Sequence, residues 1–174
     1  MNENRKLSDF MRAYGTVIAG IAIVVVFSIL SFDAFFTFGN FISITRQISL
    51  LVIIALGATL VMSVEEFDLS VGAMASLGGV VAARMAVAGM PIVFCFILPV
   101  AVCFVIGLVN GWIVTRFRVL SFITTLAMST ILAGFTFWFT GGSTIFENIP
   151  RSFTFVGTKS LFSLPLLSII MIVL

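Results

Sequence analysis

Three carboxylates stand together in "VMSVEEFDLSVGAMASLGG", residues 61–79, within a chain that has only seven acidic residues. Glu65, Glu66 and Asp68 lie within four consecutive positions between two apolar stretches. Carboxylate oxygens accept hydrogen bonds, so these groups could bind a hydroxyl-rich solute. Placing an ionised group inside a membrane is energetically unfavourable, so carboxylates found there indicate a functional site. The alternative is structural, because Asp68 or Ser70 could cap the helix that follows. The residues alone leave both interpretations open.

A second group of candidates lies in a later apolar run, where Gly107 and Gly111 form a GxxxG pair around Asn110. Small residues at this spacing let two membrane helices approach closely. The same face would carry the Asn110 amide, which we expect to bond a neighbouring helix rather than a solute. All three residues are therefore predicted to serve helix packing.

Several kinds of chemistry are disfavoured by what the chain lacks. It contains no histidine, the commonest general base and transition-metal ligand. It also contains no Walker A loop, GxGxxG or CxxC motif. The net charge is +2, without the basic stripe of a nucleic-acid-binding protein. We expect no catalytic residue, metal or cofactor, and no nucleic-acid partner.

The composition indicates which elements must position these residues. Hydrophobic residues make up 61% of the chain and charged residues 9%, with a mean hydropathy of +1.29. Soluble domains are about 45–50% apolar and about 25% charged. The sequence therefore predicts an all-α, polytopic bundle of transmembrane helices in a lipid bilayer.

Apolar runs predict about five complete spans and a truncated sixth. They cover residues 13–32, 47–64, 69–88, 92–115, 119–140 and 161–174. The acidic stretch predicts a broken helix near 64–69. Residues 33–46 are predicted to be interfacial, and residues 141–160 to form a loop. The sixth run would rise about 21 Å, short of a hydrocarbon core of about 30 Å. We therefore expect a polar N-terminal segment, 1–12, and a transmembrane domain, 13–174, that is incomplete at its C-terminus.

Basic residues near the span ends predict the orientation, because cytoplasmic loops carry an excess of Lys and Arg. A cytoplasmic N-terminus places one set inside: Arg5, Lys6, Arg12, Arg116 and Arg118. It places a smaller set outside: Arg46, Arg84, Arg151 and Lys159. We expect the N-terminus in the cytoplasm.

Two blocks of sequence resemble the permeases of bacterial sugar ABC importers, the family of ribose, xylose, arabinose, galactose and autoinducer-2 permeases. The blocks are "FDLSVG" at 67–72 and "GLVNGWIVTRFRVLSFITTLAMSTILAGFTFWFTGG" at 107–142. The family characteristically shows Asn-Gly, a basic pair, FI-x-TL and a Thr-Gly-Gly end. Its members often carry Gly-Gly or Gly-Glu where this chain has Glu65 and Glu66. The chain resembles the N-terminal half of such a permease.

The resemblance implies a transport subunit rather than an enzyme, forming the pathway for a sugar or related hydroxylated solute. It implies ATPase subunits that hydrolyse ATP, a periplasmic sugar-binding protein, a second permease copy in a homodimer, and the bacterial inner membrane. It also favours a helix break beside the pathway over a simple cap. The residues that would line the pathway or form the break are Glu65, Glu66, Asp68, Ser70 and Gly72.

Two other functions fit the residues. A truncated membrane scaffold would not transport anything, and an ion-coupled secondary carrier would also use buried acids. The carrier predicts uptake that continues without ATP.

Overall fold

The computed structural model describes residues 3–161 and 164–173 of the chain. It divides into two compact units, residues 1–47 and residues 48–174, and each is described by itself. The described residues are helical apart from turns and one pair of two-residue strands. This confirms the predicted all-α class.

The first unit contains α1 (Glu3–Leu30), α2 (Phe32–Phe35) and the beginning of α3 (Phe38–Met62). The hydroxyl of Thr37 accepts the N–H of Asn40 at 3.2 Å, which caps the start of α3. No proline follows before Met62, so the helix continues without a break. Residues 38–46 therefore belong to the same helix as the second span, and not to a separate interfacial segment as predicted.

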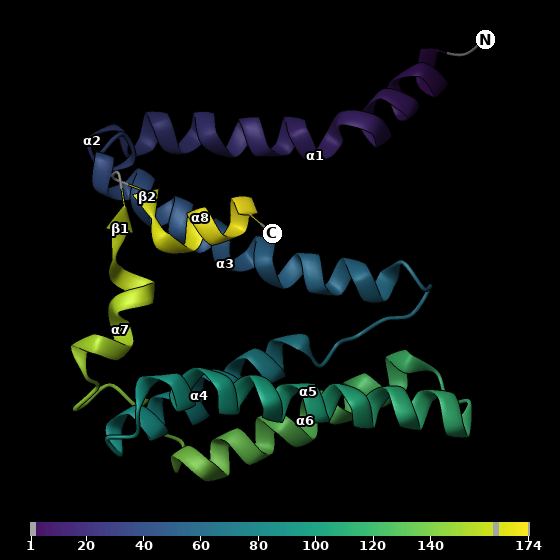
Figure 1. The fold of residues 1–174 in the computed structure, drawn as a ribbon. Coiled ribbons are helices and arrows are strands. Elements are labelled where there is room, and N and C mark those ends of the chain that lie inside the picture. The colour runs from purple at the N-terminus through teal and green to yellow at the C-terminus, as the bar shows by residue number, and fades with distance from the viewer. Residues whose placement is uncertain (1–2, 162–163, 174) are drawn as a thin grey trace. The chain divides into compact units, whose positions relative to one another are not determined.

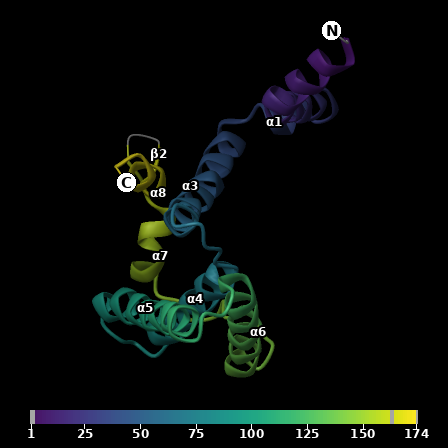
Figure 2. The same ribbon diagram turned by 90° about the vertical axis from the view of Figure 1, so that its right-hand side faces the viewer.

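The second unit centres on α4 (Val71–Val87), α5 (Ile92–Phe117) and α6 (Ser121–Thr140). Figure 1 shows these three helices as one group, and Figure 2 shows α4 between the other two. Its buried apolar cluster consists of Met85, Ala86 and Cys95, with Val81 and Phe153 packed against it. This packing joins the end of α4 to the start of α5, and the site described below lies at the opposite end of α4.

Four helices are long and apolar enough to cross a membrane by length and composition, among the residues that the structure describes. They are Ser8–Leu30, Phe38–Met62, Ile92–Phe117 and Ser121–Thr140. The predicted third span is a shorter helix, because α4 has 17 residues, or about 25 Å of rise. A turn with Gly89 at a φ of 75° and Pro91 ends it on one side, and the helix break ends it on the other.

The C-terminal part differs from the predicted loop and sixth run. Helix α7 (Arg151–Thr158) lies within the predicted loop and begins directly after Pro150, whose φ of −63° suits the entry to a helix. Strand β1 (Ser160–Leu161) pairs antiparallel with β2 (Leu164–Pro165), and α8 (Leu166–Val173) follows. Residues 162, 163 and 174 of the predicted run lie outside the described residues.

Helix α8 lies beside α3 in Figure 1, and a buried hydrogen bond joins them. The Ser49 hydroxyl donates to the Ser168 hydroxyl at 2.9 Å.

Candidate functional site: the break between α3 and α4

The chain leaves the helical path at Met62 and resumes it at Val71, so residues 63–70 form the predicted break. The turn that leaves α3 places Glu65 at a φ of 62°, where the N–H of Glu65 donates to Met62 O at 3.0 Å. This left-handed region favours glycine over other residues. Glu65 adopts this conformation at the sequence position where the sugar permeases that the chain resembles often carry glycine.

The backbone beyond the turn is supported by hydroxyls of α6 in place of helical hydrogen bonds. The N–H of Phe67 donates to Ser121 Oγ at 3.1 Å, and the N–H of Leu69 donates to Thr125 Oγ1 at 3.1 Å. Thr125 Oγ1 lies 2.8 Å from Ser121 O and 3.3 Å from Phe67 O. Both hydroxyl residues are buried. Two backbone donors that the break frees from helical pairing are therefore satisfied.

Three polar side chains connect the break to the interior of α5. Asp68 Oδ1 accepts two hydrogen bonds from Ser70, one from its N–H at 2.7 Å and one from its hydroxyl at 2.6 Å. Asn110 Nδ2 donates to Ser70 Oγ at 3.1 Å. Ser70 is fully buried and Asn110 is 4% exposed. The sequence predicted that Asn110 bonds a neighbouring helix, and its partner is Ser70, the residue directly before α4.

The capping alternative is met in part. The Asp68 carboxylate accepts the N–H of Ser70 at the entrance to α4. The Ser70 side chain itself makes no capping hydrogen bond to α4.

A cavity of about 240 Å³ opens between the break and helices α5 and α6. Its polar lining consists of Glu66, Asp68, Asn110, Thr115, Ser121 and Thr125. Gly107 and Gly111 also line it, and a Cβ built on either would meet no atom within 4 Å. Their predicted close approach to another helix therefore has no partner among the described residues and stays a prediction.

The sequence candidates divide into those at the cavity and those beside it. Glu66 and Asp68 line the cavity, and Ser70 accepts a hydrogen bond from Asn110, which also lines it. Glu65 is exposed at the turn. Gly72 is exposed in the first turn of α4, with open space around its Cα. Sequence reasoning missed Ser121 and Thr125 as site residues. Thr125 is the threonine of the FI-x-TL motif, and this motif was the signal from which Thr125 could have been predicted as a site residue.

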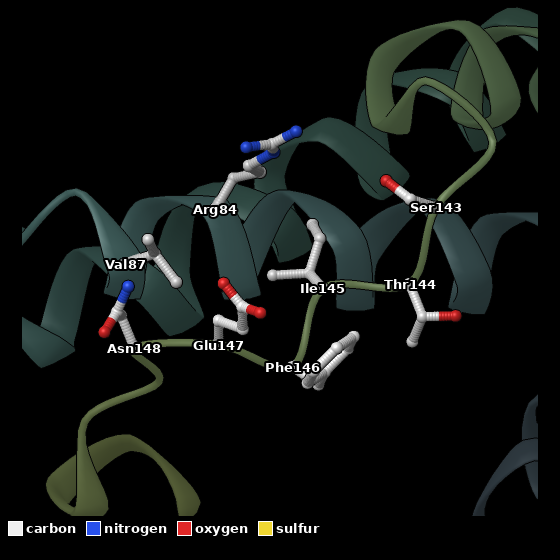
Figure 3. Close-up of a pocket in the computed structure, with 8 residues that line it drawn as sticks. All are labelled: Arg84, Val87, Ser143, Thr144, Ile145, Phe146, Glu147 and Asn148. Carbon is white, nitrogen blue, oxygen red and sulfur yellow. The ribbon is translucent and has the colours of Figure 1, made fainter.

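A second cavity, of about 380 Å³, lies at the other end of α4 against residues 143–148 (Figure 3). Arg84 lies on its rim with its guanidinium 6.0 Å from the centre of the Phe139 ring. Figure 3 shows this guanidinium turned away from the Glu147 carboxylate. Both charged side chains are exposed. The cavity at the break is the better candidate site, because Asn110, Ser121 and Thr125 in its lining are buried and hydrogen-bonded to the break.

Within residues 3–161 and 164–173, no group of three His, Cys, Asp or Glu side chains is placed to hold a metal ion. The fold and the site together define a multi-span membrane protein with a cavity at a helix break that is lined in part by polar groups.

The chain belongs to the family described as branched-chain amino acid transport system / permease component, which matches residues 40–174. It is 32% identical over 165 residues to the ribose import permease protein of Haemophilus influenzae, covering 93% of this chain and 51% of that protein. It is 37% identical over 130 residues to the ribose import permease protein of Escherichia coli K12, covering 75% and 40%. The xylose transport system permease protein of H. influenzae is 32% identical over 148 residues, covering 84% and 39%.

These matches confirm the resemblance to sugar permeases. The chain spans about half the length of the first of these relatives and about 40% of the other two. No solved structure matches it.

Proposed function

We propose that this chain forms part of the permease subunit of an ABC importer for a sugar or a related hydroxylated solute. In this proposal the cavity at the break of residues 63–70 lines the translocation pathway. The observation that carries it is the hydrogen-bonded set of half-buried Asp68 with buried Ser70 and Asn110 beside that cavity. The names of the relatives, which import ribose or transport xylose, support the class of solute.

The position of Asn110 along α5 supports a site inside the membrane. Asn110 lies seven residues before Phe117, the last residue of α5, or about 10 Å along the axis. The whole helix has 26 residues and rises about 39 Å, against a hydrocarbon core of about 30 Å. When α5 is centred across the bilayer, Asn110 and the Ser70 that it contacts would lie within the hydrocarbon region, and Thr115 would lie at its edge. Irregular backbone is tolerated there only where it is buried in protein or lines a cavity.

The proposal includes the rest of the transporter. ATPase subunits would supply ATP hydrolysis, a periplasmic sugar-binding protein would deliver the solute, and a second permease copy would complete the pathway. The chain would lie in the bacterial inner membrane with its N-terminus in the cytoplasm.

The test is uptake of labelled ribose and xylose by cells that express the complete reading frame with its ATPase and binding protein. We expect uptake that requires the ATPase. Uptake that continues without the ATPase would indicate an ion-coupled carrier, and no uptake of any sugar would favour a scaffold.

Two isosteric variants, Glu66→Gln and Asp68→Asn, then test the pathway role. Each removes a charge at the cavity, and at least one should lower the uptake rate while assembly with the ATPase is retained. Asp33→Asn is the matched control, because Asp33 is exposed in α2. Full uptake in both cavity variants would contradict the pathway role.

A further inference from the structure

We infer that Asn110 accepts a hydrogen bond from a hydroxyl group of the transported solute, and that Ser70 and Asp68 fix the orientation in which it does so. This inference rests on the proposed function and names the contact that the pathway would make. It assigns to Asn110 a solute contact beyond the packing role predicted from its sequence context.

The orientation of the Asn110 amide follows from counting protons. Asp68 Oδ1 already accepts the N–H of Ser70, and the Ser70 hydroxyl donates its single proton to the same oxygen, 2.6 Å away. Ser70 Oγ can then only accept from Asn110. The amide nitrogen must therefore face Ser70, at 3.1 Å, because two oxygens would meet there without a proton if the amide were turned over.

This orientation leaves the amide oxygen free. Asn110 Oδ1 is buried and has no hydrogen-bond partner, and the residue lines the cavity at the break. A buried acceptor without a partner carries a desolvation penalty, which a bound donor would relieve. The cavity of about 240 Å³ has room for a solute there, since a water molecule takes up only about 30 Å³ in the liquid.

Most other polar groups around the cavity favour a solute that donates hydrogen bonds, whereas the Ser121 hydroxyl, which accepts the N–H of Phe67, keeps a proton that it can donate. The Thr115 hydroxyl donates to Gly111 O at 2.7 Å, and the Thr125 hydroxyl donates to backbone oxygen, so both protons are committed. Glu66 and Asp68 present carboxylate acceptors to the cavity, and the buried Asn110 Oδ1 is a third acceptor, which a solute reaches when the lining shifts. A neutral solute that offers several hydroxyl protons matches this lining.

The experiment compares D-ribose with its monodeoxy analogues as probes. Maximal uptake rates are measured by the complete transporter with the binding protein saturated by each solute, so that loading of the binding protein does not set the rate. The variant Asn110→Leu removes the amide at similar volume. The matched control is Asn40→Leu, because the Asn40 amide bonds Phe35 O within the first unit and Asn40 is not among the residues that line the cavity.

In the parent protein we expect ribose to be taken up about 2–10 times faster than the analogue that lacks the contacting hydroxyl, the range for one neutral hydrogen bond. Asn110→Leu should lower the uptake rate of ribose about 2–10-fold. It should also abolish the preference for ribose over the analogue that lacks the contacting hydroxyl, and leave the preferences over the other analogues unchanged. Asn40→Leu should keep the preference. An unchanged preference in Asn110→Leu, or an equal loss for every solute, would overturn the inference.

A second variant, Ser70→Ala, tests the orientation and serves also if Asn110→Leu does not assemble. It keeps Asn110 but removes the hydroxyl that fixes its amide, so the preference should fall while uptake continues. A preference equal to that of the parent would contradict the role of Ser70. These failures differ from failure of the proposed function, in which the parent protein takes up no sugar at all.

Discussion

The hydroxyl of Thr125 accepts the N–H of Leu69 at 3.1 Å, although the two residues lie 56 positions apart. Leu69 belongs to the break, and Thr125 to the second turn of α6. The break is thus supported by side chains from a helix far along the sequence, in addition to its own contact between Asp68 and Ser70. This support lets non-helical backbone persist among long apolar helices.

Removing the Thr125 hydroxyl should destabilise the break. Thr125→Val keeps the shape of the side chain but leaves the N–H of Leu69 without its acceptor, which we expect to lower the free energy of unfolding by about 1–3 kcal/mol. Thermal unfolding of the detergent-solubilised protein measures this. The control is Thr130→Val, since the exposed Thr130 hydroxyl bonds only Leu126 O within its own helix. Equal effects of the two variants would refute the support assigned to Thr125.

Glu65→Gly should preserve the break and stabilise it. The φ of 62° at Glu65 strains a residue with a Cβ but not glycine, so the gain should be about 1 kcal/mol in the free energy of unfolding. Glu65→Val should lower it, because a branched Cβ tolerates this region least. Both are measured by unfolding, together with sugar uptake. A large loss of uptake in Glu65→Gly would show that the carboxylate itself matters.

Gly142→Ala should weaken the end of α6. Gly142 has a φ of 74°, and an added Cβ would lie 2.9 Å from two atoms of the Phe137 ring. The left-handed conformation alone costs a residue with a Cβ about 1–2 kcal/mol. Gly134→Ala, inside α6, is the control, because no atom lies within 4 Å of its Cβ position. We expect a lower midpoint of thermal unfolding for Gly142→Ala only, and an equal or higher midpoint for that variant would contradict this.

The long helices and the break could be predicted from the sequence because both depend on local composition. Apolar runs mark α1, α3, α5 and α6, and the carboxylates mark the stretch where α3 ends and α4 begins. The start of α3 was missed because it depends on one cap, the Thr37 hydroxyl, within an otherwise ambiguous aromatic segment.

The arrangement of the site could be predicted only in part. Asn110 was recognised as unusual, but its partner Ser70 lies 40 positions away, and no local pattern pairs them. Ser121 and Thr125 look like ordinary helix residues until the fold brings them against Phe67 and Leu69. The left-handed conformation of Glu65 is a property of the backbone, which side-chain type does not reveal. The one sequence signal for it was that the sugar permeases often carry glycine where this chain has Glu65.

The central claim is that the break lines a solute pathway, and labelling of single cysteines tests it most directly. Cys95 and Cys103 are free in the structure and would first be replaced by alanine. Glu66→Cys and Asp68→Cys then place a thiol at the cavity, and Ile131→Cys is the control on an exposed apolar position of α6.

A membrane-impermeant thiol reagent is applied to the assembled transporter with and without saturating sugar and binding protein. We predict that both cavity positions are labelled, that the transported sugar slows their labelling, and that Ile131→Cys is not labelled. Labelling of positions 66 and 68 at one membrane face, at a rate that the sugar does not change, would make the break a surface turn and contradict the account.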